Sequence, residues 1–142
     1  MRPRPVDTLL MSVVLAIAAC ASGTEPGPPP VPLVGEWSYE GTQTSPHSAT
    51  LDGTLEVDRQ SGQRFEGSLD VIESAAGGGR RLTGLLSGLA FDAQTVDFDV
   101  TIDGIARRHV AEVRGDSLVG TWAEVSVGGG TGAFHAVRQG AP

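Results

Sequence analysis

From residue 34 onward, apolar and polar side chains alternate with a period of two along most of the chain. This period is typical of β-strands with one buried face, and no window shows the 3.6-residue stripe of an amphipathic helix. The pattern predicts eight strands, over Val34–Glu40, Thr50–Arg59, Arg64–Glu73, Arg81–Phe91, Thr95–Ile102, Ile105–Arg114, Ser117–Val125 and Gly132–Arg138.

The connections between these segments are short. Asp103-Gly104 and Gly115-Asp116 have the composition of two-residue hairpin turns, which join antiparallel neighbours. Closing a sheet of eight such strands removes its two exposed edges. We therefore expect an all-β domain, a small eight-stranded antiparallel up-and-down barrel over residues 34–138; a β-sandwich is the alternative. Four glycines in the apolar phases would let strands bend at barrel corners: Gly53, Gly67, Gly120 and Gly132.

Two segments leave their inward face undecided. Residues 81–91 are apolar in both phases. In 105–114, exposed polar side chains on one strand face are the rule, which favours Ala106, Arg108 and Val110 inside, with His109 exposed. In the other phase, Arg107 and His109 face inward and could hold the carboxylate of an amphiphile. Trp122 shares the phase of Leu118 and Gly120, so we expect its side chain inside the barrel.

The first nineteen residues have the pattern of a secretory signal. Arg2 and Arg4 precede an apolar run over 9–19 that is too short to span a bilayer. Ile17-Ala18-Ala19-Cys20 ends this run and contains the only cysteine of the chain. These four residues resemble the lipobox of bacterial lipoproteins.

That resemblance implies that Cys20 is acylated and becomes the first residue of the mature protein. Several acyl chains would anchor it firmly in a membrane, and Ala21 favours the outer membrane of the bacterial envelope. Residues 20–33, rich in proline and glycine, read as a tether of about 3 Å per residue where extended. Residues 139–142 would form a short C-terminal tail.

Gly35-Glu36-Trp37 opens the first predicted strand, and Arg138 ends the last. In this respect the chain resembles lipocalins and related calycin barrels, in which a Gly-x-Trp packs beneath an Arg from the last strand and closes the bottom. The resemblance implies that Gly35, Trp37 and Arg138 close this barrel. The chain departs from the family by lacking a Thr-Asp-Tyr-like second motif and a C-terminal helix.

Charge and chemistry narrow the function classes. Without residues 1–19, the chain has eight arginines and sixteen acidic residues, a formal net charge of −8, which disfavours nucleic-acid binding. His47, His109 and His135 lack the spacing of metal ligands, and Asp97, Asp99 and Asp103 read as a solvated strand face. We expect neither a metal nor a cofactor.

No nucleophile–base arrangement stands out either, so we do not expect an enzyme. Two functions remain open. The domain could bind a small apolar or amphipathic ligand inside the barrel, with Arg107, His109 and Trp122 facing it. Alternatively, a filled barrel could serve as a structural or protein-interaction module of the envelope, with a partner that the sequence does not identify.

Overall fold

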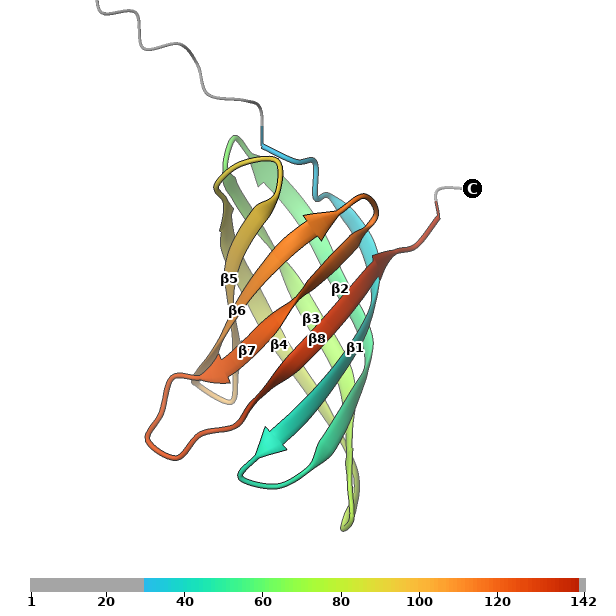
Figure 1. The fold of residues 1–142 in the computed structure, drawn as a ribbon, viewed down its shortest axis with the longest axis vertical. Helices are drawn as coiled ribbons and strands as arrows, with labels where there is room; N and C mark the ends of the chain where they lie inside the picture. The colour runs from blue at the N-terminus through green and yellow to red at the C-terminus, as the bar shows by residue number, and fades with distance from the viewer. Residues whose placement is uncertain (1–29, 141–142) are drawn as a thin grey trace, which may run out of the picture.

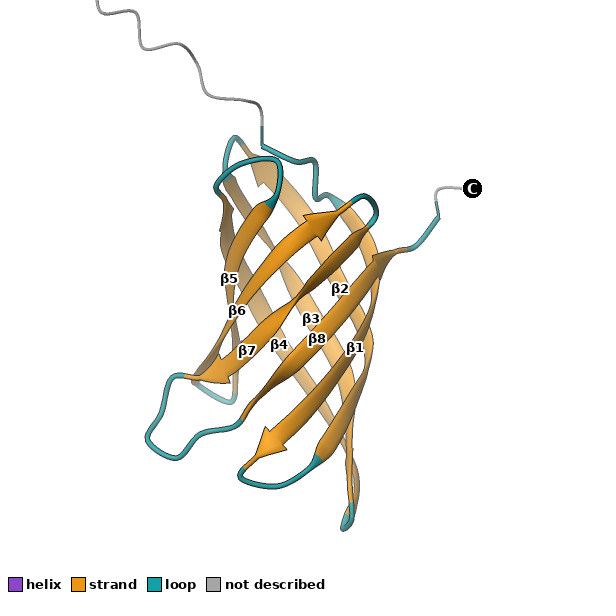
Figure 2. Ribbon diagram, viewed as in Figure 1, coloured by secondary structure: helices purple, strands orange, loops and turns teal. Residues whose placement is uncertain are grey.

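The computed structural model describes residues 30–140, and every regular element in that range is a β-strand (Figures 1 and 2). The strands are β1 (Gly35–Ser45), β2 (Ala49–Ser61), β3 (Arg64–Ala75), β4 (Gly78–Ala90), β5 (Thr95–Ile102), β6 (Ile105–Arg114), β7 (Ser117–Glu124) and β8 (Thr131–Arg138). Each strand pairs antiparallel with the next, and β8 pairs with β1, which closes the barrel. The predicted up-and-down barrel is confirmed, and the sandwich alternative is wrong.

No helix in residues 30–140 is long and apolar enough to cross a membrane.

Five strands, β1 to β4 and β8, are longer than predicted, and β1 and β4 extend furthest at one end. β1 continues to Ser45 instead of ending at Glu40, because Gly41 and Gln43 carry on the inward phase without a large apolar side chain. β4 begins at Gly78, so only residues 76–77 form the turn before it. Apolar alternation does not predict these extensions, because β1 continues with glycine and a polar residue in the inward phase and β4 begins with the exposed Gly78, Gly79 and Arg80.

The structure also settles the two undecided phases. In β4, Leu82, Leu86 and Ala90 are buried, whereas Leu85 is 77% exposed on the outer wall. In β6, the favoured prediction is wrong: Arg107 and His109 lie inside, and Arg108 and Val110 lie outside. Register explains this outcome, because His109 stands opposite Phe98 of β5 and Trp122 of β7, both of which are buried.

Local geometry matches the glycine positions. Asp103 and Gly104 both have positive φ, 52° and 79°, as a type I′ hairpin turn requires. At the corner positions a Cβ would lie 1.6–2.1 Å from a carbonyl oxygen of the neighbouring strand, for Gly53, Gly67, Gly120 and Gly132. These close approaches exclude any side chain and allow the sheet to coil tightly into a barrel.

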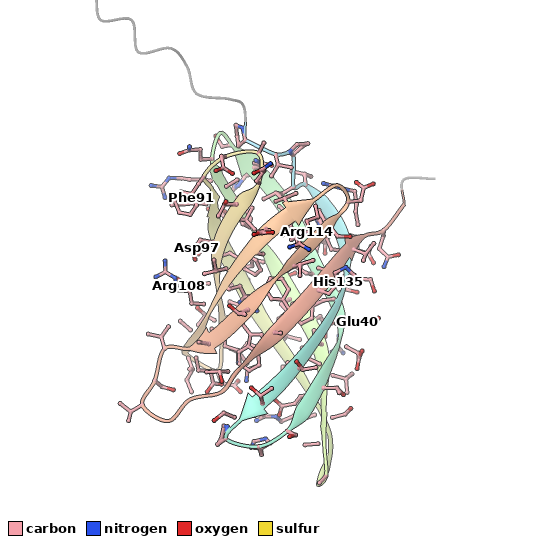
Figure 3. All side chains as sticks on the ribbon, in the orientation of Figure 1. Glu40, Phe91, Asp97, Arg108, Arg114 and His135 are labelled. Carbon is pink, nitrogen blue, oxygen red and sulfur yellow. The ribbon has the colours of Figure 1, made fainter. Side chains whose placement is uncertain are left out.

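The outer wall is mainly polar. Arg81 bonds Asp70 and Arg108 bonds Asp97, each across two adjacent strands. Figure 3 shows the Asp97, Arg108 and His135 side chains outside the wall. Asp97 and Asp99 of the predicted solvated row therefore lie on the outer face of β5, and Asp103 is exposed in the turn that follows this strand.

One end of the barrel is sealed by Leu33, Trp37 and Arg138, and we refer to it as the sealed end. Trp37 is fully buried, and the guanidinium carbon of Arg138 lies 4.3 Å from the centroid of its ring. Arg138 also donates hydrogen bonds to the carbonyl oxygens of Val34, at 2.8 Å, and Pro32, at 2.6 Å. The residues named by the calycin resemblance thus lie together at this end.

Leu33 is part of the core, although the sequence pattern assigned it to the tether. It is 1% exposed, and its carbonyl oxygen accepts a hydrogen bond from the Trp37 indole at 3.0 Å. The side-chain amide of Gln60 holds this segment through bonds to Leu33 and Val31. The folded domain therefore begins at Val31, four residues before the first strand.

We expect Trp37→Ala to lower the free energy of unfolding by about 3–5 kcal/mol, because a large aromatic side chain is removed from the core. Arg138→Ala should cost less, and the two effects should be non-additive since the groups stack. Urea unfolding of both single variants and the double variant measures this. Arg114→Ala, at an exposed ion pair with Glu112, is the control and should change stability by less than about 0.5 kcal/mol. Additive effects of Trp37→Ala and Arg138→Ala would contradict the proposed stack.

Candidate functional site

The interior is layered along the barrel axis, and its middle layer is aromatic. Phe98 stacks on the His109 ring with centroids 4.6 Å apart, and Tyr39 stacks on Phe134 at 5.4 Å. His109 is 1% exposed, and Phe134 meets its ring edge-on at 5.1 Å. These side chains fill the centre of the barrel.

The hydrogen bonds of His109 fix its tautomer. Nδ1 lies 3.0 Å from the carbonyl oxygen of Arg107, which can only accept, so Nδ1 carries the proton. Nε2 lies 3.2 Å from the Tyr39 hydroxyl and therefore accepts its proton. Burial, followed by the nearby Arg107 charge, lowers the pKa of His109 to about 4. Burial likewise raises the pKa of the Tyr39 hydroxyl, so both groups are neutral at pH 7.

The end opposite the sealed end is lined inside by Gln43, Glu73, Arg107, Trp122 and Glu124, and we call it the polar end. Arg107 is 6% exposed and donates from Nε at 3.1 Å and Nη2 at 2.9 Å to one oxygen of Glu124. The Glu73 carboxylate lies 3.9 Å from Arg107 and 3.2 Å from Arg80. Two carboxylates thus balance two guanidinium groups.

Trp122 has the one buried side-chain polar atom in residues 30–140 without a hydrogen-bond partner, its indole Nε1. The residue is 2% exposed, and the guanidinium carbon of Arg107 lies 5.0 Å from the centroid of its ring. A buried N–H without a partner costs about 1–3 kcal/mol. The polar end therefore holds a donor that an acceptor atom from outside the protein could satisfy.

The loop between β7 and β8, residues 125–130, contacts this end through Gly130, its one buried residue, and its other residues project outward. The Gly130 amide donates to Oε2 of Glu124 at 2.9 Å, and the Glu124 amide donates to the Gly130 carbonyl at 2.8 Å. The hydrogen bond from Gly130, followed by the contact with Arg107, lowers the pKa of Glu124. Glu124 is therefore ionised at pH 7 and links the loop to the interior.

The residues singled out from the sequence fall into three places. Arg107, His109 and Trp122 lie inside the barrel, the first and last at the polar end and His109 in the middle layer. Gly35, Trp37 and Arg138 lie at the sealed end, and Cys20 lies outside the described residues. His47 and His135 are exposed; the side-chain amide of Gln43 donates to the His47 carbonyl at 3.1 Å.

Sequence reasoning missed Gln43, Glu73 and Glu124. Each continues an inward phase at the end of its strand, as Glu73 follows Leu69 and Val71. A polar side chain in an apolar phase was the signal available for all three. Among residues 30–140, no three His, Cys, Asp or Glu side chains come together as metal ligands.

Hollows occur on the outside of the barrel. Five of them, with volumes of about 280–590 Å³, are bordered mainly by outward-facing side chains and by glycine backbone at the corners. The largest lies beside Leu85, between β2 and β5.

No family model and no curated protein matches this sequence. Solved structures match its fold. EF1p2_mFAP2b bound to DFHBI has a TM-score of 0.62 at 14% identity, over 75% of this chain and 94% of its own. A redesigned β-barrel, mFAP1, bound to DFHBI has a TM-score of 0.58 at 16% identity over the same shares. A de novo designed fluorescence-activating β-barrel has a TM-score of 0.53 at 17% identity, again over 75% and 94%.

Identities this low show the fold alone. The chain is a small closed β-barrel similar in architecture to designed barrels, two of which were solved with a small molecule bound.

We expect acid to destabilise the barrel through His109. Its pKa is about 4 when folded and 6.5 without burial, so the unfolded state binds the proton more tightly. The stability contributed at neutral pH, up to about 3 kcal/mol, is therefore lost as the pH falls from about 6.5 to 4. Urea unfolding across this range measures the slope.

His109→Gln retains an acceptor for Tyr39 and should flatten the pH profile, whereas the exposed His135→Gln should leave it unchanged. Equal slopes for the wild type and His109→Gln would show that another group causes the acid sensitivity.

Proposed function

We propose that this chain is a non-enzymatic, lipid-anchored protein of the bacterial envelope whose barrel binds a small amphipathic molecule at the polar end. The unpartnered Trp122 N–H beside the buried Arg107 carries the proposal. Stability alone does not require charges inside a barrel, because apolar residues of similar volume serve at least as well. A few convergent polar groups within an apolar enclosure are typical of a ligand site.

The two ends of the barrel suit an anchored binding protein. Residues 30–33 meet the barrel at the sealed end, together with the C-terminal end of β8 (Figure 1). A lipid group on Cys20 would therefore attach on the sealed side and leave the polar end directed away from the anchor. In the outer membrane, the proposed location, a ligand would then approach the polar end without crossing the bilayer.

The interior also favours a second function, that of a filled interaction module. Apolar and aromatic side chains occupy the barrel from the sealed end through the middle layer, and the five hollows lie on the outer wall. Leu85 beside the largest hollow is 77% exposed, as an apolar contact for a protein partner would be. Ligand binding separates the two functions.

Cys20→Ser should leave the precursor unlipidated and uncleaved at residue 20, because the thiol is the acyl acceptor that the lipobox resemblance implies. Labelling of cells with radioactive palmitate, followed by membrane fractionation, measures this. The neighbouring Ser22→Ala should be labelled like the wild type. A Cys20→Ser protein that is still labelled and processed would contradict the lipid anchor.

Decanoate or decanol should change the fluorescence of Trp122 saturably in the full chain, prepared as Cys20→Ser so that no acyl group competes. Trp37→Phe leaves Trp122 as the only indole, since the chain has two tryptophans. The melting temperature should rise with ligand concentration. At a free ligand concentration about a hundred times Kd, the free energy of unfolding should increase by about 2.7 kcal/mol. In Trp122→Phe, the remaining Trp37 at the sealed end should not respond.

A cooperative melting transition that neither decanoate nor decanol shifts would contradict the proposed ligand binding. That outcome would leave the filled barrel, with its outer wall as the interaction surface.

A further inference from the structure

Glu124 has a different partner on each of its two carboxylate oxygens. Oε1 accepts both hydrogen bonds from Arg107, at 3.1 and 2.9 Å. Oε2 accepts the hydrogen bond from the Gly130 amide, at 2.9 Å. One side chain therefore joins the buried cation to the β7–β8 loop.

The loop covers the interior at Gly130. A Cβ at this position would lie 2.7 Å from Oε1 of Gln43 and 3.2 Å from Cη2 of Trp122, so the backbone rests directly on these side chains. The part of the loop that precedes Gly130 is exposed, and the Val125 and Val127 side chains lie in solvent. Figure 1 shows it at the end of the barrel away from the sealed end. Moving Gly130 outward would therefore uncover Gln43 and Trp122.

The charges at the polar end are already balanced. Arg107 and Arg80 face Glu124 and Glu73, and both carboxylates are closer than 4 Å to a guanidinium. A further anion beside the buried Arg107 would leave this partly buried cluster with one negative charge in excess, which is costly where the charges are shielded from water. An anion can enter without that penalty only if one carboxylate leaves.

Glu124 is the carboxylate placed to leave. It is the last residue of β7, and the loop that it holds begins at the next residue. Glu73 lies two residues inside the end of β3 and keeps Arg80 as a second partner. Rotation of the Glu124 side chain toward solvent would free the Gly130 amide at the same time and leave the backbone bond from the Glu124 amide to the Gly130 carbonyl as the remaining tie of Gly130 to β7.

We propose that Glu124 occupies the place of the ligand's anionic group on Arg107, and that an anionic amphiphile displaces it and thereby opens the β7–β8 loop. This inference rests on the proposed ligand-binding function. It assigns the ligand a singly charged anionic head that bonds Arg107, and the Trp122 N–H provides a further donor for an acceptor atom. A neutral amphiphile of equal length has no means of displacing Glu124.

Two matched ligands and two matched variants test the exchange, in the full chain as Cys20→Ser. Decanoate and decanol have the same chain length and differ in charge. Glu124→Gln and Glu73→Gln each remove one negative charge from the same cluster, but only Glu124 bonds the loop. We expect Glu124→Gln to bind decanoate at least about tenfold more tightly, with decanol affinity unchanged, whereas Glu73→Gln changes decanoate affinity about threefold or less. An equal gain in decanoate affinity in the two variants would show that only the net charge of the cluster matters. That result would overturn the proposed displacement of Glu124.

Hydrogen exchange of the Gly130 amide gives a readout that needs no variant. Saturating decanoate should accelerate its exchange at least about tenfold, while amides in the middle of β7 stay protected, and decanol should leave it slow. If decanoate binds while the Gly130 amide stays protected, the proposed displacement of Glu124 is overturned and the ligand-binding function remains. Failure of both ligands to bind would remove both.

Discussion

The pairing of β8 with β1 is the constraint on which the rest of the structure depends. It turns a meander into a closed wall, and closure gives every strand one inward and one outward phase along its whole length. Gln43 and Glu73, which carry polar side chains in the inward phase, are enclosed by the wall as a result. The corner glycines belong to the same constraint, because the wall can coil tightly only where no Cβ stands between strands, as at Gly132.

Closure also separates the barrel into two ends with different chemistry. The sealed end combines a buried indole, a stacked guanidinium and an inserted leucine, all with satisfied polar atoms. The polar end holds compensating charges and one indole N–H without a partner. The Tyr39–His109 pair lies between them, neutral and fully bonded, and provides a rigid floor for the polar end. The two ends therefore differ in their polar groups. Those of the sealed end are hydrogen-bonded within the protein, whereas the polar end has a donor without a partner.

Much of this architecture was readable from the sequence, and the reasons for the remainder are physical. Alternation and turn composition predict eight strands in order, because both depend on near neighbours along the chain. The phase of β6 was misjudged since exposed charge is the usual state of arginine, and burial of Arg107 depends on Glu124 and Glu73 from β7 and β3. Leu33 was assigned to the tether because its proline-rich surroundings predict no regular structure. Its burial depends on Trp37 and Gln60, which no local pattern connects to it.

The position of Leu33 has a mechanical consequence. Since this residue is inserted into the core and Arg138 clasps the carbonyls of Pro32 and Val34, the chain leaves the barrel from within its packing rather than from a loose strand end. A force that pulls on the N-terminal side would act first on the buried Leu33 side chain and on the Arg138 hydrogen bonds. Only afterwards would it act on the pairing of β1 with its neighbours. Leu33 and Arg138 therefore resist such a force at the sealed end, and the polar end, on the far side of the molecule, is protected from it.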